Sequence, residues 1–161
     1  MTDTPVRNIT KLTLDEKSVV RRSAEVEHER AVAIYDLLEE NLFRPDGLGD
    51  GPFHLRLRIE DNRLIFSILP DGEEEVLQEL MLPLSKFRKI VRDYFLICES
   101  YFEAIKTATL AQIEAIDMGR RGIHNEGAEL LRERLTSSDI EVDVDTSRRL
   151  FTLVCVLHFR A

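Results

Sequence analysis

The chain has 161 residues, of which 43% are hydrophobic and 32% are charged, with a formal net charge of −8 at pH 7. This length fits one domain, and the balance of apolar and charged residues is typical of a folded protein rather than a disordered one. The acidic excess argues against a broad, non-specific hold on nucleic acid. The longest strongly apolar run, around residues 94–98, is far shorter than the roughly 20 residues that cross a bilayer.

The first part of the chain predicts an edge strand and then a helix. Residues 1–8 are expected to be frayed, and residues 9–14 to form a short strand. Ser23 is the expected N-cap of the helix, and the Pro-Asp-Gly sequence at 45–47 ends it. The apolar residues at helical spacing are Ala31, Ile34, Tyr35, Leu38 and Leu42.

The strongest local pattern is a β-hairpin over residues 53–69. Apolar and polar residues alternate from Phe53 to Glu60, and Asp61-Asn62 suits a two-residue turn because both residues tolerate positive φ. A turn there places three apolar pairs on one face: Leu55 with Ile68, Leu57 with Phe66, and Ile59 with Leu64. A further strand at 76–82 follows the turn at 70–72, so we predict an antiparallel meander.

Two helices are predicted next. The segment from Ser85 to Ile105 is apolar nearly all round a helix, which places it at the centre of the domain or against a partner chain. Thr109 and Gln112 have the spacing of a capping box and begin a shorter helix over 110–118.

A break and a third helix complete this middle region. The glycine-containing segment 119–122 is expected to end the 110–118 helix, and a new helix is expected from Ile123 to about Leu135.

The C-terminal residues predict a second hairpin. Ile140, Val142 and Val144 alternate with acidic residues, and the nearly continuous apolar run at 150–159 fits an interior strand. We therefore predict a single α+β domain over residues 1–161. Its antiparallel sheet combines the meander with this hairpin, and its helices pack mainly on one face around the long apolar helix that begins near Ser85.

The best candidate for a functional site is the segment 117–126, which gathers two arginines, a histidine, an amide and two carboxylates around glycines. With a helix starting at Ile123, Arg120 and Arg121 would lie beside its N-terminal N–H groups, where phosphate or carboxylate binds well. His124 titrates near neutral pH and completes the set. The candidate residues for an anion or partner site are Arg120, Arg121, His124, Asn125 and Glu126.

Three interpretations of this segment stay open. It is an elbow between helices in which Asp117 and Glu126 neutralise the arginines and Asn125 caps a helix end; or it is a non-catalytic site for an anion or a partner; or His124 or Glu126 acts in acid–base catalysis. No established catalytic pattern matches the segment.

The sequence lacks the residue patterns of other familiar functional sites. The four histidines have no metal-ligand spacing to cysteine or carboxylate, so no metal is expected. The glycines at 47–51 lack the Lys-Ser/Thr and the helix that follow them in a phosphate-binding loop, and no nucleophile elbow is present. We therefore predict neither a cofactor nor a recognisable catalytic set. Cys98 and Cys155 lie in apolar segments and are expected as buried free thiols, which together with the lack of a charged leader indicates the cytoplasm.

Basic residues cluster at 86–92, at Arg120 and Arg121, and at Arg148 and Arg149. No exposed aromatic residues are expected among them to stack bases, so a local anion site is favoured over a nucleic-acid surface.

Several segments resemble an uncharacterised protein family of alphaproteobacteria: Arg92–Phe95 with Cys98–Tyr101, Gln112–Gly127 and Asp145–Leu157. The most specific stretch is Met-Gly-Arg-Arg-Gly-Ile-His-Asn-Glu-Gly at 118–127. The resemblance implies a bacterial cytosolic source and a stand-alone domain, and it brings no reaction, ligand or catalytic residue.

The sequence thus favours a non-enzymatic cytoplasmic binding or regulatory protein, with an anionic small molecule or a protein partner at the 117–126 segment. A homodimer through the long apolar helix is expected, and contact with membrane is not. The alternative hypotheses are a small enzyme acting on a phosphorylated or carboxylated metabolite, and an RNA- or ribosome-associated protein.

Overall fold

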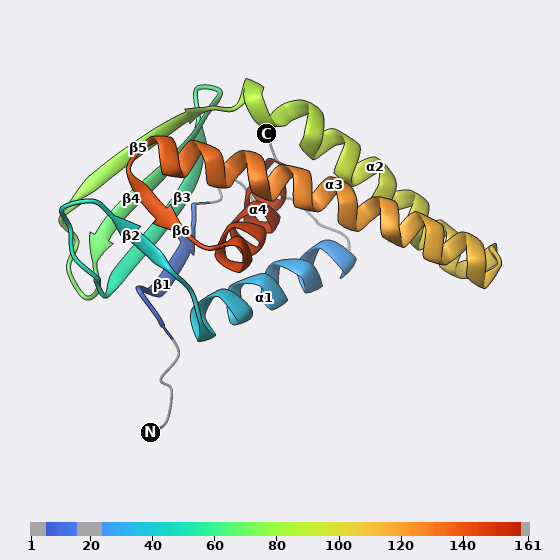
Figure 1. Cartoon of the computed structure of the whole chain (residues 1–161), viewed down its shortest axis with the longest axis horizontal. Coiled ribbons are helices and arrows are strands. Elements are labelled where there is room, and N and C mark those ends of the chain that lie inside the picture. The colour runs from blue at the N-terminus through green and yellow to red at the C-terminus, as the bar shows by residue number, and fades with distance from the viewer. Residues whose placement is uncertain (1–5, 16–23, 159–161) are drawn as a thin grey trace.

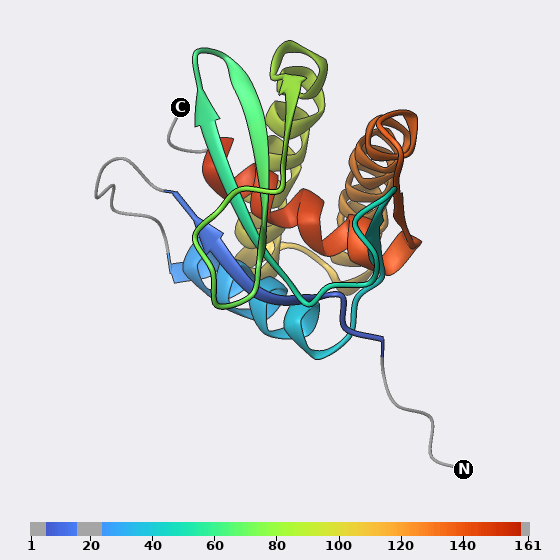
Figure 2. The same cartoon turned by 90° about the vertical axis from the view of Figure 1, so that its left-hand side faces the viewer.

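The computed structural model describes residues 6–15 and 24–158 of the protein. The fold is α+β, as predicted, and its helices pack against one face of the main sheet (Figures 1 and 2). The elements in chain order are β1 (Ile9–Leu14), α1 (Ala24–Glu39), β2 (Phe43–Pro45), β3 (Phe53–Glu60), β4 (Arg63–Pro70), β5 (Gln78–Pro83), α2 (Ser85–Thr107), α3 (Leu110–Ser137), β6 (Ile140–Val142) and α4 (Val144–His158).

The main sheet has the strand order β1-β3-β4-β5. The predicted meander is confirmed in its register, because Leu55 pairs with Ile68 and Leu57 pairs with Phe66. Asp61 and Asn62 form the turn with φ of 51° and 60°. β1 is an edge strand, as predicted, and it runs parallel to β3. The turn chemistry and the period of two are local properties, which is why they predict this hairpin so well.

The region around the predicted end of the first helix differs from expectation. α1 ends at Glu39, and residues 43–45 form β2, which pairs antiparallel with β6 in a separate two-stranded sheet. Residue 8 is not frayed: Asn8 is 3% exposed and its side chain accepts a hydrogen bond from Phe43 N at 2.9 Å. Ser23 and residues 1–5 lie outside the described residues.

The predicted C-terminal hairpin is wrong, because residues 144–158 form the helix α4. Asp143 begins it: the Asp143 carboxylate accepts a hydrogen bond from Thr146 N at 2.8 Å, as an N-cap does. From Leu150 to Leu157 only Thr152 escapes burial. A helix that is apolar on all sides must be covered on all sides, and its short apolar run cannot be told from that of an interior strand.

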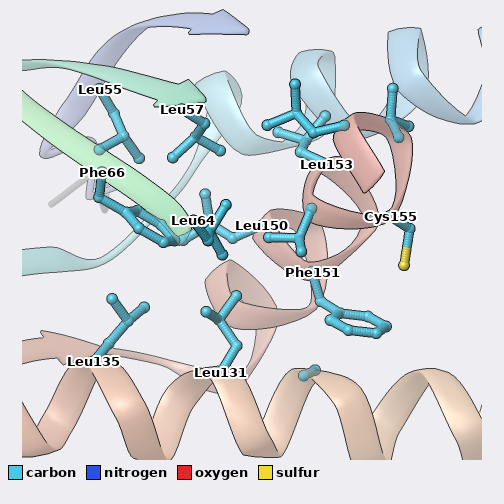
Figure 3. Packing of buried hydrophobic residues seen from close by; sticks show 14 of the residues in the cluster. Leu55, Leu57, Leu64, Phe66, Leu131, Leu135, Leu150, Phe151, Leu153 and Cys155 are labelled. Carbon is cyan, nitrogen blue, oxygen red and sulfur yellow. The ribbon is translucent and has the colours of Figure 1, made fainter. Parts of the chain in front are cut away.

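α4 therefore forms the centre that the sequence assigned to the helix beginning at Ser85. α2 buries one face only, and on its other surfaces Leu96 is 56% and Ile105 is 52% exposed. In Figure 1 α4 lies in the middle of the molecule, and in Figure 3 its side chains meet Leu64 and Phe66 of the sheet and Leu131 and Leu135 of α3.

The predicted break at residues 119–122 is also wrong, because α3 continues without interruption from Leu110 to Ser137. Its start is as predicted, with Thr109 and Gln112 forming a capping box. The glycines have a packing role instead. A Cβ atom at Gly119 would lie 2.8 Å from Ile97 Cδ1 of α2, and one at Gly127 would lie 2.1 Å from Phe151 Cζ of α4.

Two glycine substitutions test whether the chain forms a continuous helix or an elbow at residues 119–122. Gly122 is exposed with no atom near its added Cβ, so Gly122→Ala should raise the free energy of unfolding by about 1 kcal/mol, the helix propensity gain. Gly127→Ala should lower it by roughly 3 kcal/mol because of the overlap with Phe151. Urea unfolding measures both. A destabilising Gly122→Ala would show that the chain turns at this point.

Candidate functional site

A cleft of ≈ 480 Å³ opens between α1, α3 and α4, and three helical stripes line it. Each stripe repeats at intervals of three or four residues, so its members share one face of their helix. Tyr94 of α2 also borders the cleft. The lining residues are His28, Glu29, Val32, Ala33 and Asp36 on α1; Arg120, Arg121 and His124 on α3; and Asp145, Arg148, Arg149 and Thr152 on α4.

Arg120 is held by other side chains of the protein. Its Nε and Nη2 atoms donate to Asp117 Oδ1 at 3.1 Å and 2.6 Å, and its Nη1 lies 3.9 Å from Glu29 Oε1 on α1. Its guanidinium carbon also lies 4.7 Å from the centre of the Tyr101 ring. The hydrogen bonds from Arg120 lower the pKa of Asp117. Together with the contacts to Glu29 and Tyr101 they link α3 to α1 and α2, so Arg120 is mainly a structural residue.

The remaining arginines differ in how freely they face the cleft. Arg121 is 60% exposed and has one ion pair, 3.2 Å from Nη2 to Asp117 Oδ2. Arg149 donates to the Glu40 carbonyl at 3.2 Å, just beyond the end of α1. The Arg148 side chain has neither an ion-pair partner nor a hydrogen bond within the described parts of the chain. Arg148 and Arg121 are therefore the cations most available to a ligand.

His124 is a neutral, packed side chain. Its ring lies 5.3 Å from the ring of Tyr94 and 5.3 Å from that of Phe151, centroid to centroid. Its Nε2 lies 2.8 Å from Thr152 Oγ1, and that hydroxyl donates to the Arg148 carbonyl at 3.3 Å. Burial, together with the nearby positive charges of Arg148 and Arg120, lowers the pKa of His124 to about 4.

Four titratable groups at or near the wall of the cleft, those of Glu29, Tyr94, Cys98 and Cys155, are partly or fully buried. Burial raises the pKa of the Glu29 carboxyl, and the nearby Arg120 guanidinium and Tyr94 hydroxyl partly oppose this rise. Burial also raises the pKa of the Cys98 thiol to about 11 and that of Cys155 well above its usual range. Both cysteines are free and buried, as predicted, and neither is a reactive thiolate.

The structure brings together only part of the predicted site. Arg120, Arg121 and His124 line the cleft, whereas Asn125 and Glu126 are exposed and are not among its lining residues. The helix N-terminus predicted at Ile123 is absent, because α3 continues through that residue. The elbow interpretation is correct in one respect, since Asp117 neutralises both arginines in part.

Sequence reasoning missed the acidic side of the cleft, at Glu29, Asp36 and Asp145, and it noted Arg148 and Arg149 only as a basic pair. The available signal was the helical spacing of 145, 148, 149 and 152, which the strand prediction for this region concealed.

A second hollow of ≈ 650 Å³ lies between the turn after β2 and the strand β6. Its arginines are engaged: Arg44 Nε is 3.2 Å from Asp50, and Arg132 donates to the Val142 carbonyl at 3.2 Å. The rest of its polar lining is largely acidic, and the described residues contain no group of three or more His, Cys, Asp or Glu side chains that could hold a metal ion.

A model of the uncharacterised protein family UPF0262 matches residues 6–160. The chain belongs to this family. A UPF0262 protein of Paramagnetospirillum magneticum is 62% identical over 154 residues, which cover 96% of this chain and 97% of that protein. Those of Azorhizobium caulinodans and Rhizobium meliloti are 56% and 60% identical, over 99% and 91% of this chain and 99% and 91% of their own lengths.

These relatives confirm the predicted resemblance to an alphaproteobacterial family, and the function of the UPF0262 family is unknown. No solved structure matches the chain. Among the described residues, none of the helices is both long enough and apolar enough to pass through a bilayer.

The low pKa of His124 makes the stability of this UPF0262 protein depend on pH. The pKa is about 4 in the folded state against 6.5 in the unfolded state, so the unfolded chain binds more protons between these values. The stabilisation is complete above pH 6.5 and is lost as the pH falls towards 4, by about 3 kcal/mol at most. His54 and His158 also have lowered pKa values and act in the same direction.

Chemical unfolding of the wild type and of His124→Gln between pH 7 and pH 4.5 isolates this contribution. We expect the variant to lose less stability than the wild type on acidification. Equal losses in both proteins would show that His124 is not a buried neutral group.

Proposed function

We propose that this protein is a non-enzymatic binding or regulatory protein that holds a small molecule by its carboxylate or phosphate in the cleft between α1, α3 and α4. The availability of Arg148 carries the proposal: this guanidinium lines the cleft without any ion pair or hydrogen bond to the described residues. Arg121, on the facing helix α3, supplies a second cation that is 60% exposed. The cleft volume lies within the range of small-molecule sites.

The state of His124 supports binding rather than catalysis. With a pKa of about 4 it is neutral at pH 7 and is a weak base, and its Nε2 is already hydrogen-bonded to Thr152. Glu126, the other predicted acid–base residue, lies outside the lining of the cleft. The pair proposed from sequence for proton transfer is therefore not assembled around a common space.

One observation favours the enzyme alternative through a different residue. Glu29 borders the cleft and its pKa is raised by burial, and a carboxyl group with such a pKa is a candidate acid or base. Turnover of a phosphorylated or carboxylated metabolite that Glu29→Gln abolishes would replace the binding proposal with this one.

Association with RNA has less support. In the basic cluster at the start of α2, Lys89 pairs with Asp93 at 3.0 Å and Arg88 donates to Asn62 at 2.6 Å. The cleft itself carries three carboxylates, which repel a nucleic-acid backbone.

Binding through Arg148 is tested by a thermal-shift screen of inorganic phosphate, nucleotides, carboxylic acids and amino acids, followed by calorimetric titration of each compound that responds. We expect Arg148→Gln to weaken binding by about tenfold to a hundredfold, the loss of a charge-assisted hydrogen bond. Arg92→Gln, an exposed arginine away from the cleft, is the control and should bind as the wild type does. A wild type that responds to none of these compounds, or a variant with unchanged affinity, contradicts the proposal.

We further propose a cytoplasmic location, which agrees with two free, buried cysteines.

We also propose a homodimer. The apolar side chains that a second copy would cover are exposed on the outer part of the α2–α3 hairpin: Ile105 is 52%, Leu110 is 71% and Met118 is 68% exposed. Light scattering should give twice the chain mass for the wild type and a monomer for the double variant Leu110→Glu/Met118→Glu. A monomeric wild type would refute the dimer and leave ligand binding untouched.

A further inference from the structure

The charges that line the cleft are mixed, and this limits what binds there. Four arginines face three carboxylates, Glu29, Asp36 and Asp145. Three of the arginines have partners in the protein, since Arg120 and the more exposed Arg121 pair with Asp117 and Arg149 donates to the Glu40 carbonyl, and Arg148 has none among the described residues. The charges left for a ligand therefore include both signs.

Two of the carboxylates are as free as Arg148. Within the described parts of the chain, the side chains of Asp36 and Asp145 form no ion pair and no hydrogen bond. Asp145 stays unpaired although Arg148 follows three residues later on α4, a spacing at which opposite charges often pair.

The helix contacts place these free groups along the cleft. Leu42 N donates to Thr146 Oγ1 at 2.9 Å, so the first turn of α4, with Asp145, lies near the C-terminal end of α1. Asp36 belongs to that same end of α1. Arg120 reaches Glu29, which lies nearer the N-terminal end of α1, so the α3 side of the cleft, with Arg121, lies toward that end.

Arg148 lies one turn along α4 from Asp145, in the direction of Thr152 and His124. One part of the cleft thus offers two free carboxylates, and the adjoining part offers Arg148 and Arg121. Val32, Ala33 and the Tyr94 ring add apolar surface beside them.

A ligand with negative charge alone would meet repulsion from Asp36 and Asp145, and one with positive charge alone would meet Arg148 and Arg121. A zwitterion satisfies both sets, because each of its charges replaces solvent at a group of opposite sign.

On the basis of the binding function proposed above, we propose that the ligand is a free α-amino acid or a close aminocarboxylate, with its carboxylate at Arg148 and Arg121 and its ammonium group at Asp36 and Asp145. The apolar surface of Val32, Ala33 and Tyr94 receives part of its side chain, and neutral His124 adds no charge to this balance.

The test is calorimetric titration of the whole chain with each of the twenty standard amino acids, and with the des-amino acid and the decarboxylated amine that match each one that binds. We expect at least one amino acid to bind at least tenfold more tightly than both of its analogues. In Asp36→Asn/Asp145→Asn the preference over the des-amino acid should disappear, whereas Arg148→Gln should weaken the amino acid and the des-amino acid alike.

Glu74→Gln/Glu75→Gln removes the same charge from exposed positions away from the cleft, and it should retain the full preference. Equal binding of an amino acid and its des-amino acid, or binding of simple carboxylates or phosphates with no amino acid bound, overturns the aminocarboxylate assignment and leaves the anion site standing. If no amino acid, carboxylate or phosphate binds, both proposals fail.

Discussion

The rest of the structure depends on the burial of the C-terminal half of α4, residues 150–157. Between Leu150 and Leu157 every side chain except that of Thr152 is at most 4% exposed. Burying each large apolar side chain stabilises the fold by about 1.5–3 kcal/mol, but only when another element covers every side of the helix. The sheet, α1 and α3 supply that cover, and the close approach of Gly127 to Phe151 shows how tightly α3 is fitted to it.

The same requirement creates the cleft. Because much of α4 is buried in the core, the charged side chains of its first half, with Thr152, lie along one stripe that runs from Asp145 through Arg148 to Thr152. That stripe lines the cleft together with residues of α1 and α3. The candidate site is therefore the polar edge of the core.

The side chains that line the cleft are of two kinds: some are paired with other side chains of the protein and stabilise the fold, and others have charges that are free to contact a ligand. Arg120 is hydrogen-bonded to Asp117, paired with Glu29 and in contact with the Tyr101 ring. His124 is neutral and packs against the rings of Tyr94 and Phe151. These groups satisfy one another, as partly buried polar groups must. What remains among the described residues is a small set of unpaired charges of both signs, on which the proposed choice of ligand rests.

The sequence by itself determined the α+β class, the register of the β3–β4 hairpin, the capping box of α3 and the family resemblance, because each is recorded in neighbouring residues. It also pointed to Arg120, Arg121 and His124, which do line a common cleft. Only the tertiary structure decided that residues 150–157 are helical, since burial on all sides removes the periodicity that separates helix from strand. It likewise decided that Gly119 and Gly127 allow helices to pack closely, and that α1 and α4 complete the site, because those contacts join residues distant in the chain.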